Sequence, residues 1–288
     1  MNRWLLGARP RTLPAAIVPV AVGTAAAVGT TGIIWWRAGA ALVVAGALQV
    51  GTNFANDYSD GVRGTDGEQR VGPPRLVGGG LATPAQVKRA AMLCFGVAGV
   101  VGFFVALAVG PELFVVGALS IAAGWFYTGG PRPYGYAGLG EVFVFVFFGL
   151  VATIGSTYVH TESISGTSVL AAVVVGLPVT SLLVINNLRD IPGDTASGKR
   201  TLAVRIGDMR TRFLYMMLIV ASFVLLLPLA AFRIGAVAAV VAVPLAVRAA
   251  KPVMAEAKGS ELIAVLGATG QMELVLGLAL ALGLALSS

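Results

Sequence analysis

Charged residues are scarce in this chain of 288 residues. Asp, Glu, Lys and Arg together make up only 11% of it, and 57% of the residues are hydrophobic, whereas soluble globular domains carry about 25% charged residues. The mean hydropathy is +0.87. This composition excludes an ordinary soluble domain and indicates a polytopic membrane protein whose surroundings are a lipid bilayer.

Cysteine and histidine each occur once. Cys94 lies inside an apolar run and has no second cysteine to pair with, so packing is its expected role. Because His160 is the single histidine, a metal site built from a histidine cluster is excluded. His160 falls in a short polar loop, which predicts a solvated side chain. The formal net charge is +7, but the basic residues form no single aqueous domain. Membrane topology therefore explains them better than nucleic-acid binding, and we expect no nucleic-acid partner.

Apolar runs divide the chain into nine segments, each close to the ~20 residues that cross a bilayer. We therefore predict an all-α fold, a polytopic membrane helical bundle of about nine transmembrane helices, forming one domain over residues 1–288. The 38 glycines favour close packing between such helices. The predicted spans are 12–29, 38–57, 87–109, 112–128, 139–158, 168–189, 212–231, 234–250 and 262–286.

The lysines and arginines predict the topology. With a cytoplasmic N-terminus, all 20 of them except Arg37 and Arg233 fall in cytoplasmic segments or at the adjoining helix ends. Such an excess is typical of cytoplasmic loops. We expect a multi-pass protein of the cell (inner) membrane with its active site facing the cytoplasm. The predicted cytoplasmic segments are 1–11, 58–86, 129–138, 190–211 and 251–261.

Two polar stretches follow apolar runs on this predicted cytoplasmic side. In the first, Asn53, Asn56, Asp57 and Asp60 share one face if the helix continues to Asp60, and Asp66 follows after a glycine break. Oxygen ligands at this density suit a hard cation such as Mg²⁺. The alternative is a solvated helix end.

The second polar stretch covers residues 186–202. Asp190 and Asp194 lie four residues apart, but Pro192 predicts that the helix ends near Asp190 and that a turn presents Asp194. Two such clusters on one side of the membrane indicate a paired cation site.

Basic residues follow both clusters. Carboxylates, Mg²⁺ and cationic side chains together suit a diphosphate, because the metal bridges carboxylate and phosphate oxygens while arginines bind the remaining oxygens. The alternative is the basic character of any cytoplasmic loop. The cations are Arg63, Arg70 and Arg75 after the first cluster, and Lys199, Arg200 and Arg205 after the second.

An aromatic stretch covers residues 124–141. Tyr127 could face a developing carbocation through its ring, although aromatic residues are also common at membrane interfaces. Glu141 lies just inside an apolar run and needs a partner, for which Arg132 is the candidate.

These motifs resemble the UbiA superfamily of intramembrane aromatic prenyltransferases. The two acidic motifs and the nine spans carry this resemblance. A narrower similarity, to the branch that prenylates 1,4-dihydroxy-2-naphthoate in menaquinone biosynthesis, rests on shorter strings: RPRTLP at 9–14, NDYSD at 56–60, GPPRLV at 72–77, YTGGP at 127–131, NLRD at 187–190 and GKRTL at 198–202.

The resemblance implies roles for individual residues. One Mg²⁺ would be held by Asn53, Asn56, Asp57 and Asp60, and another by Asp190 and Asp194. The residues expected to be catalytic are Asp66, Tyr127 and Lys199, and those expected to bind substrate are Asn53, Arg63, Arg132, Asn187, Arg189, Lys199 and Arg200.

The implied reaction joins a polyprenyl diphosphate to 1,4-dihydroxy-2-naphthoate, with loss of carbon dioxide. Within the superfamily, a hydroxybenzoate, a haem or a sugar phosphate would be alternative acceptors. A cation-coupled transporter is an alternative of another class, but it would be expected to carry charges nearer the bilayer midplane. A structural scaffold would leave both acidic clusters unexplained.

Overall fold

The computed structural model describes residues 2–65, 72 and 74–287. The regular secondary structure of these residues consists of helices, joined by turns and loops, without a strand. This confirms the all-α prediction. Seven helical segments are long and apolar enough to cross a membrane. They are α3 (Trp35–Arg63), α4 (Pro84–Val109), α6–η3–α7 (Gly140–Val144, Phe145–Val151 and Ala152–Thr161), α8 (Gly166–Ala196), α10–α11 (Asp208–Val224 and Leu226–Phe232), η4–α12 (Ile234–Ala242 and Val243–Met254) and α13 (Glu261–Leu286).

Two further apolar helices are shorter. They are α2 (Pro14–Ala26), with 13 residues, and α5 (Glu112–Phe126), with 15 residues. Each of the nine predicted segments coincides with one of these helical segments, but α2 and α5 fall short of the ~20 residues of a full span. The total of nine spans therefore stays a prediction.

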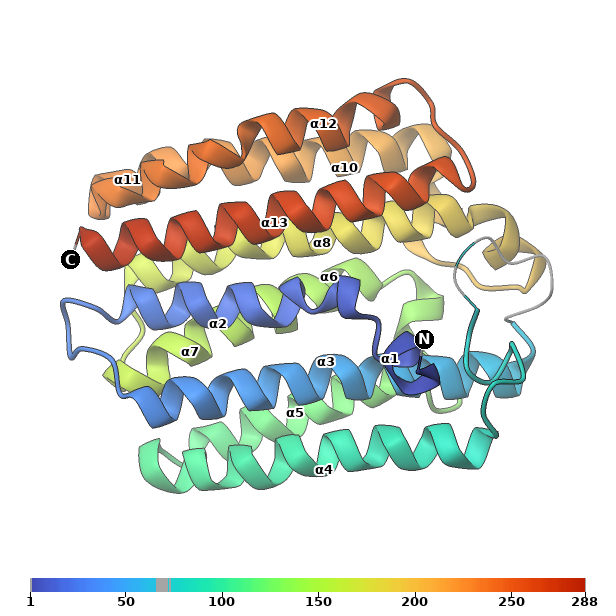
Figure 1. Cartoon of the computed structure of the whole chain (residues 1–288), viewed down its shortest axis with the longest axis horizontal. Coiled ribbons are helices and arrows are strands. Elements are labelled where there is room, and N and C mark those ends of the chain that lie inside the picture. Colours follow the sequence, from blue (N-terminus) through green and yellow to red (C-terminus); the bar gives the residue numbers. More distant parts are fainter. Residues whose placement is uncertain (1, 66–71, 73, 288) are drawn as a thin grey trace.

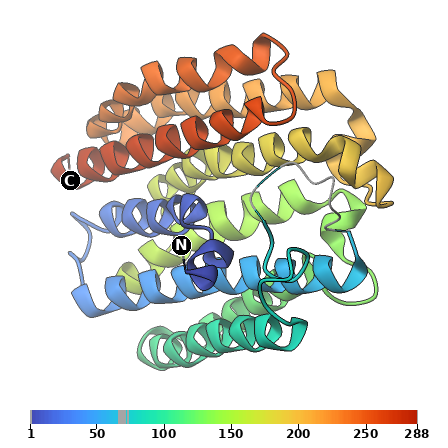
Figure 2. The same cartoon turned by 45° about the vertical axis from the view of Figure 1, so that its right-hand side comes forward.

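The long helices run side by side, with α4 at one edge of the bundle and α10 and α12 at the opposite edge (Figures 1 and 2). The short helix α1 (Arg3–Ala8), the C-terminal ends of α3 and α8, and the chain beyond α8 gather at one end, on the right of Figure 1. That end contains the described residues of the segments predicted to be cytoplasmic. Which side of the membrane it faces stays a prediction.

Local signals explain where the helices that build this end begin and stop. α3 has 29 residues and is about 44 Å long at ~1.5 Å per residue, longer than the ~30 Å hydrocarbon core, so its last turns can carry polar groups beyond the lipid tails. Gly64 ends it with a positive φ of 71°, which glycine adopts without strain. Thr83 and Gln86 form a capping box at the start of α4.

The structure corrects the prediction for the second polar stretch. α8 does not end near Asp190 but continues through Pro192 to Ala196. Pro192 is exposed near the C-terminal end of the helix, and the last turn is supported by the Thr195 hydroxyl, which donates to the Ile191 carbonyl at 2.7 Å. Asp194 is therefore presented from the helix itself.

His160 was also predicted wrongly. It lies in α7, is 3% exposed, and its Nδ1 accepts the Ile34 N–H at 3.2 Å. The polar segment after it supplied no signal of this contact, because the connection between α2 and α3 that covers His160 is far away in sequence.

Close packing brings η3 against α8. A Cβ added to Gly149 would lie 2.6 Å from the Cα of Gly176, so only glycine fits at position 149. This contact fixes the π-helical segment η3, and with it the aromatic side chains of the α6–η3 helix, relative to α8.

Candidate active site

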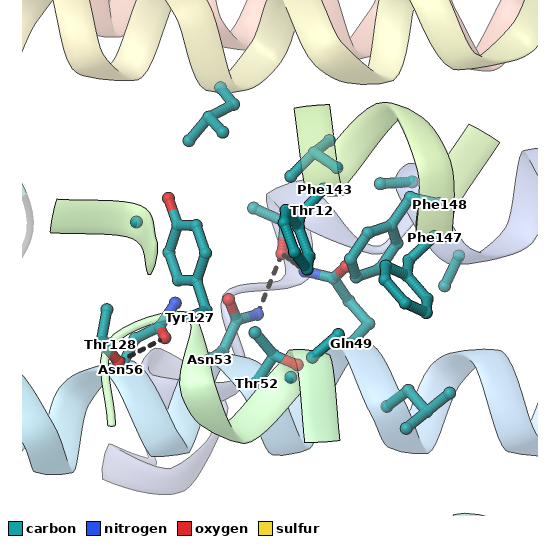
Figure 3. Close-up of a pocket in the computed structure, with 18 of the residues that line it drawn as sticks. Thr12, Gln49, Thr52, Asn53, Asn56, Tyr127, Thr128, Phe143, Phe147 and Phe148 are labelled. Carbon is teal, nitrogen blue, oxygen red and sulfur yellow. Dashed lines mark hydrogen bonds between the residues drawn. The ribbon is translucent and has the colours of Figure 1, made fainter. Parts of the chain in front are cut away.

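A cavity of about 1250 Å³ opens between α2, α3, α5, η3 and α8. Polar side chains line one part of it and apolar ones line the rest; Figure 3 shows a part of this lining. Its volume exceeds that of most small-molecule pockets, which hold about 300–1,000 Å³. It can therefore hold a polar headgroup together with a long apolar tail.

The first acidic motif lies on the cavity wall. α3 continues past Asp60, and Asn53, Asn56, Asp57 and Asp60 all line the cavity. Their exposed fractions are only 4%, 9%, 1% and 5%. A carboxylate buried this deeply requires charged or hydrogen-bonding partners.

Asp57 is surrounded by such partners. Its Oδ2 accepts the Leu76 N–H at 3.1 Å. Its Oδ1 lies 3.6 Å from Arg9 Nη2 and 3.5 Å from Arg75 Nε. Two segments distant in sequence thus bring cations to one buried carboxylate.

Asp60 pairs with Lys199. The Lys199 Nζ lies 3.1 Å from Asp60 Oδ2 and 4.8 Å from the centroid of the Tyr136 ring. The Tyr136 hydroxyl donates to Asp60 Oδ1. Burial, followed by the Asp60 charge, raises the pKa of Tyr136 well above its ordinary value, so the phenol stays protonated and remains a donor.

The second acidic motif lines the cavity from α8. Arg189 donates to Asp190 Oδ1 at 2.7 Å and Oδ2 at 2.6 Å, and to Asn186 Oδ1 at 2.9 Å. The Thr201 hydroxyl donates to Asp194 Oδ2 at 3.4 Å. The structure therefore brings both acidic motifs to one cavity, although they lie far apart in the sequence.

Tyr127 and Asn187 line this cavity as well. Asn187 Nδ2 donates to Glu141 Oε1 at 2.9 Å. The partner of Glu141 is thus Asn187. The prediction that Arg132 pairs with Glu141 was wrong, and the side chain of Arg132 is exposed.

Three predicted substrate-binding arginines lie outside the described lining of the cavity. Arg132 and Arg200 are exposed. Arg63 donates to the main-chain carbonyls of Thr128 and Gly130, which ties the end of α3 to the connection after α5. Asp66, expected to be catalytic, lies outside the residues that the structure describes.

The donor set at the polar end consists of oxygen atoms, which is the chemistry that Mg²⁺ prefers. In the described part of the chain, no three His, Cys, Asp or Glu side chains are close enough together to hold a metal ion. The carboxylates instead form ion pairs with Arg9, Arg75, Lys199 and Arg189. The oxygen ligands are therefore of the chemical type that a hard divalent cation needs. Its binding would weaken the ion pairs that these carboxylates now form.

Sequence reasoning missed several polar groups of the wall. Gln49 is 7% exposed and donates from Nε2 to the Thr12 hydroxyl at 3.0 Å. The Thr128 hydroxyl donates to Asn56 Oδ1 at 2.8 Å and so holds that amide in place. A polar residue inside the apolar run of α3 was a usable signal for Gln49, because such residues within membrane spans are usually functional.

Residues 16–261 match the UbiA prenyltransferase family. The chain belongs to this family. It is 51% identical over 283 residues to the 1,4-dihydroxy-2-naphthoate octaprenyltransferase of Mycobacterium tuberculosis, covering 98% of this chain and 97% of that protein. It is 38% identical over 310 residues to the Escherichia coli protein of the same name, covering 99% and 95%. As a UbiA prenyltransferase, the chain is an enzyme of prenyl transfer.

Solved structures of the UbiA family share the fold. A UbiA homologue from Archaeoglobus fulgidus bound to GPP and Mg²⁺ matches with a TM-score of 0.66 over 97% of this chain and 99% of that one. A digeranylgeranylglyceryl phosphate synthase matches with a TM-score of 0.62 over 99% and 98%. At 12% and 15% identity, these likenesses support the fold alone.

Proposed function

We propose that this UbiA prenyltransferase transfers a polyprenyl group from polyprenyl diphosphate to 1,4-dihydroxy-2-naphthoate, giving demethylmenaquinol, carbon dioxide and diphosphate. The observation that carries the proposal is the similarity, over almost the full chain, to two proteins named for this naphthoate. The cavity supports it, because two acidic motifs and several cations line the polar end of one long apolar chamber.

The reaction balances without an oxidant. The C–O bond of the allylic diphosphate breaks, and the diphosphate leaves with the electron pair. The ring carbon that bears the carboxylate forms a new bond to the allylic carbon. Its bond to the carboxylate then breaks, carbon dioxide leaves, and the released electron pair restores the aromatic ring.

Residues of this chain would position and neutralise the diphosphate. Asn56, Asp57 and Asp60 would hold one Mg²⁺, and Asp190 and Asp194 would hold another. Bound there, Mg²⁺ would supply positive charge to the leaving diphosphate.

The side chains around this position would bind the diphosphate and face the allylic cation. Lys199 would exchange its pairing with Asp60 for a phosphate oxygen. Arg189 would keep Asp190 oriented, and the ring of Tyr127 would face the allylic cation. The apolar part of the cavity would hold the polyprenyl tail away from water.

We also propose that residues 1–288 form one catalytic domain in the inner membrane, with the polar end of the cavity facing the cytoplasm. The support is the gathering of the basic segments at one end of the bundle (Figure 1), since cytoplasmic ends carry this excess.

The test is an assay of the purified protein in lipid or detergent. It would receive 1,4-dihydroxy-2-naphthoate and geranylgeranyl diphosphate, with Mg²⁺ or with a chelator, and the product would be followed by mass. We expect a Mg²⁺-dependent product that has lost carbon dioxide. Diphosphate binding without this product would point to another acceptor, and neither binding nor turnover in folded protein would favour a transporter.

A further inference from the structure

Two buried amides precede Asn56, Asp57 and Asp60 along α3. Gln49 and Asn53 are four residues apart on α3, so their side chains share a face one helical turn apart. Both line the cavity and are 7% and 4% exposed. Figure 3 shows both side chains extending from α3 toward Thr12.

The hydrogen bonds fix how the Asn53 amide points. Asn53 Nδ2 donates to the Ala8 carbonyl at 3.0 Å and to Thr12 Oγ1 at 3.1 Å. A side-chain amide nitrogen carries two hydrogens, so both are engaged. The Ala8 carbonyl can only accept, which rules out the flipped amide. What Asn53 offers to a ligand is its carbonyl oxygen.

Thr12 orients the Gln49 amide in the same way, with its nitrogen engaged and its carbonyl oxygen left as the acceptor. The Thr12 hydroxyl donates its single hydrogen to the Arg9 carbonyl at 2.9 Å, so its oxygen must accept from Gln49 Nε2 at 3.0 Å. The Gln49 carbonyl oxygen is therefore the acceptor end of that amide. Two hydrogen-bond acceptors thus stand one turn apart on one wall of the cavity.

The opposite wall is aromatic. The rings of Tyr134 and Phe143 stack with centroids 3.9 Å apart, and those of Phe143 and Phe147 stack with centroids 5.9 Å apart. All three residues line the cavity. A flat aromatic ligand can pack against such a wall and still present its edge to Gln49 and Asn53.

We propose that Gln49 and Asn53 accept hydrogen bonds from the two hydroxyls of a para-dihydroxy aromatic acceptor and thereby select and orient it. One helical turn separates the amides by about 6 Å along the axis, a distance that suits oxygens on opposite sides of one ring. This inference rests on the proposed function and names the subsite of its acceptor.

The orientation brings the reacting carbon toward the diphosphate. Asn53 is the amide nearer to Asn56 and Asp57 along α3, so the hydroxyl on Asn53 lies at the polar end of the ring. In 1,4-dihydroxy-2-naphthoate the carbon that bears the carboxylate is next to the 1-hydroxyl. We therefore assign the 1-hydroxyl to Asn53 and the 4-hydroxyl to Gln49. Arg9, whose Nη2 lies 3.5 Å from the main-chain carbonyl oxygen of Asn53, brings a cation close to this part of α3, where that carboxylate would lie.

The experiment compares kcat/KM for 1,4-dihydroxy-2-naphthoate with kcat/KM for 1-hydroxy-2-naphthoate, which lacks one donor. In Gln49→Leu, which keeps the approximate size but removes the acceptor, we expect the preference for the diol to fall by about 10-fold, the value of one buried hydrogen bond. Gln271→Leu, the same change at an exposed glutamine outside the described cavity lining, should leave the preference unchanged. The KM for the prenyl diphosphate should not change in either variant.

An unchanged preference in folded Gln49→Leu would overturn the inference. If that variant does not fold, the same comparison is made with the wild-type protein. Its KM for 1-hydroxy-2-naphthoate should exceed its KM for 1,4-dihydroxy-2-naphthoate by at least about 10-fold. Equal KM values would overturn the inference. Turnover of both naphthoates without discrimination defeats this inference alone. Turnover of neither defeats the proposed function as well.

Discussion

Lys199 Nζ lies 3.1 Å from Asp60 Oδ2, so an ion pair joins the polar end of α3 to the chain that follows α8. Both side chains are mostly buried, at 11% and 7% exposed. Partial removal from water makes such a pair stronger than one on the surface, but also makes it costly to leave either charge alone. The pair therefore couples the two acidic motifs while holding a cation at the place proposed for the diphosphate.

Replacing Lys199 with Met should lower kcat/KM for the prenyl diphosphate by about 10- to 100-fold, because charge-assisted hydrogen bonds contribute roughly 1.5–3 kcal/mol. Steady-state kinetics with varied diphosphate would measure this. Lys258→Met, at an exposed lysine, is the matched control and should behave as wild type. Equal kinetics in both variants would remove Lys199 from the diphosphate site.

Asp57→Asn and Asp190→Asn should each reduce turnover at least ~100-fold, since removing one stabilising group for a leaving diphosphate costs this much in comparable sites. Asparagine keeps the shape of the side chain, so the protein should still fold. Glu256→Gln changes an exposed carboxylate and serves as the control. Retained activity in either aspartate variant, with normal thermal unfolding, would contradict the paired-metal proposal.

Arg63, Arg132 and Arg200 should differ in their effects. Arg63 holds two carbonyls of the connection after α5, so Arg63→Met should lower the apparent melting temperature and the turnover together. Arg132→Gln and Arg200→Gln change exposed side chains outside the described cavity lining and should leave the KM for the diphosphate within about two-fold, as surface substitutions usually have small effects. A large rise in that KM for either would show that its side chain reaches the substrate.

Glu273 is buried in α13, and within the described structure neither of its carboxylate oxygens has a hydrogen-bond partner. Burying such a group costs roughly 1–3 kcal/mol. Glu273→Leu should therefore raise the apparent melting temperature in detergent by a few degrees. Glu273→Gln, which keeps the polar shape, should give a smaller change. A lower melting temperature in Glu273→Leu would show that the acid stabilises the bundle.

Local pattern was enough to predict the helices and one face of the site. The spacing of Asn53, Asn56, Asp57 and Asp60 placed them on one helical wall because helix periodicity depends only on neighbouring residues. The same reasoning failed for Asp194, where Pro192 argued for a turn. The helix nevertheless continues through Pro192 to Ala196, since local propensity does not register the packing of α8 in the bundle.

The amino-acid sequence by itself determined the all-helical fold and the common face of the first acidic motif, because apolar run length and helical spacing are local properties. Its motifs also carried the resemblance to the UbiA family, which the family match shows. Only the tertiary structure decided which charges meet. Arg9 and Arg75 reach Asp57, and Lys199 reaches Asp60, through segments that are distant along the chain. It also decided that Gln49 and Asn53 present carbonyl oxygens to the cavity, since Ala8 at the end of α1 and Thr12 in η1 (Pro10–Thr12) orient them only once this segment has packed against α3.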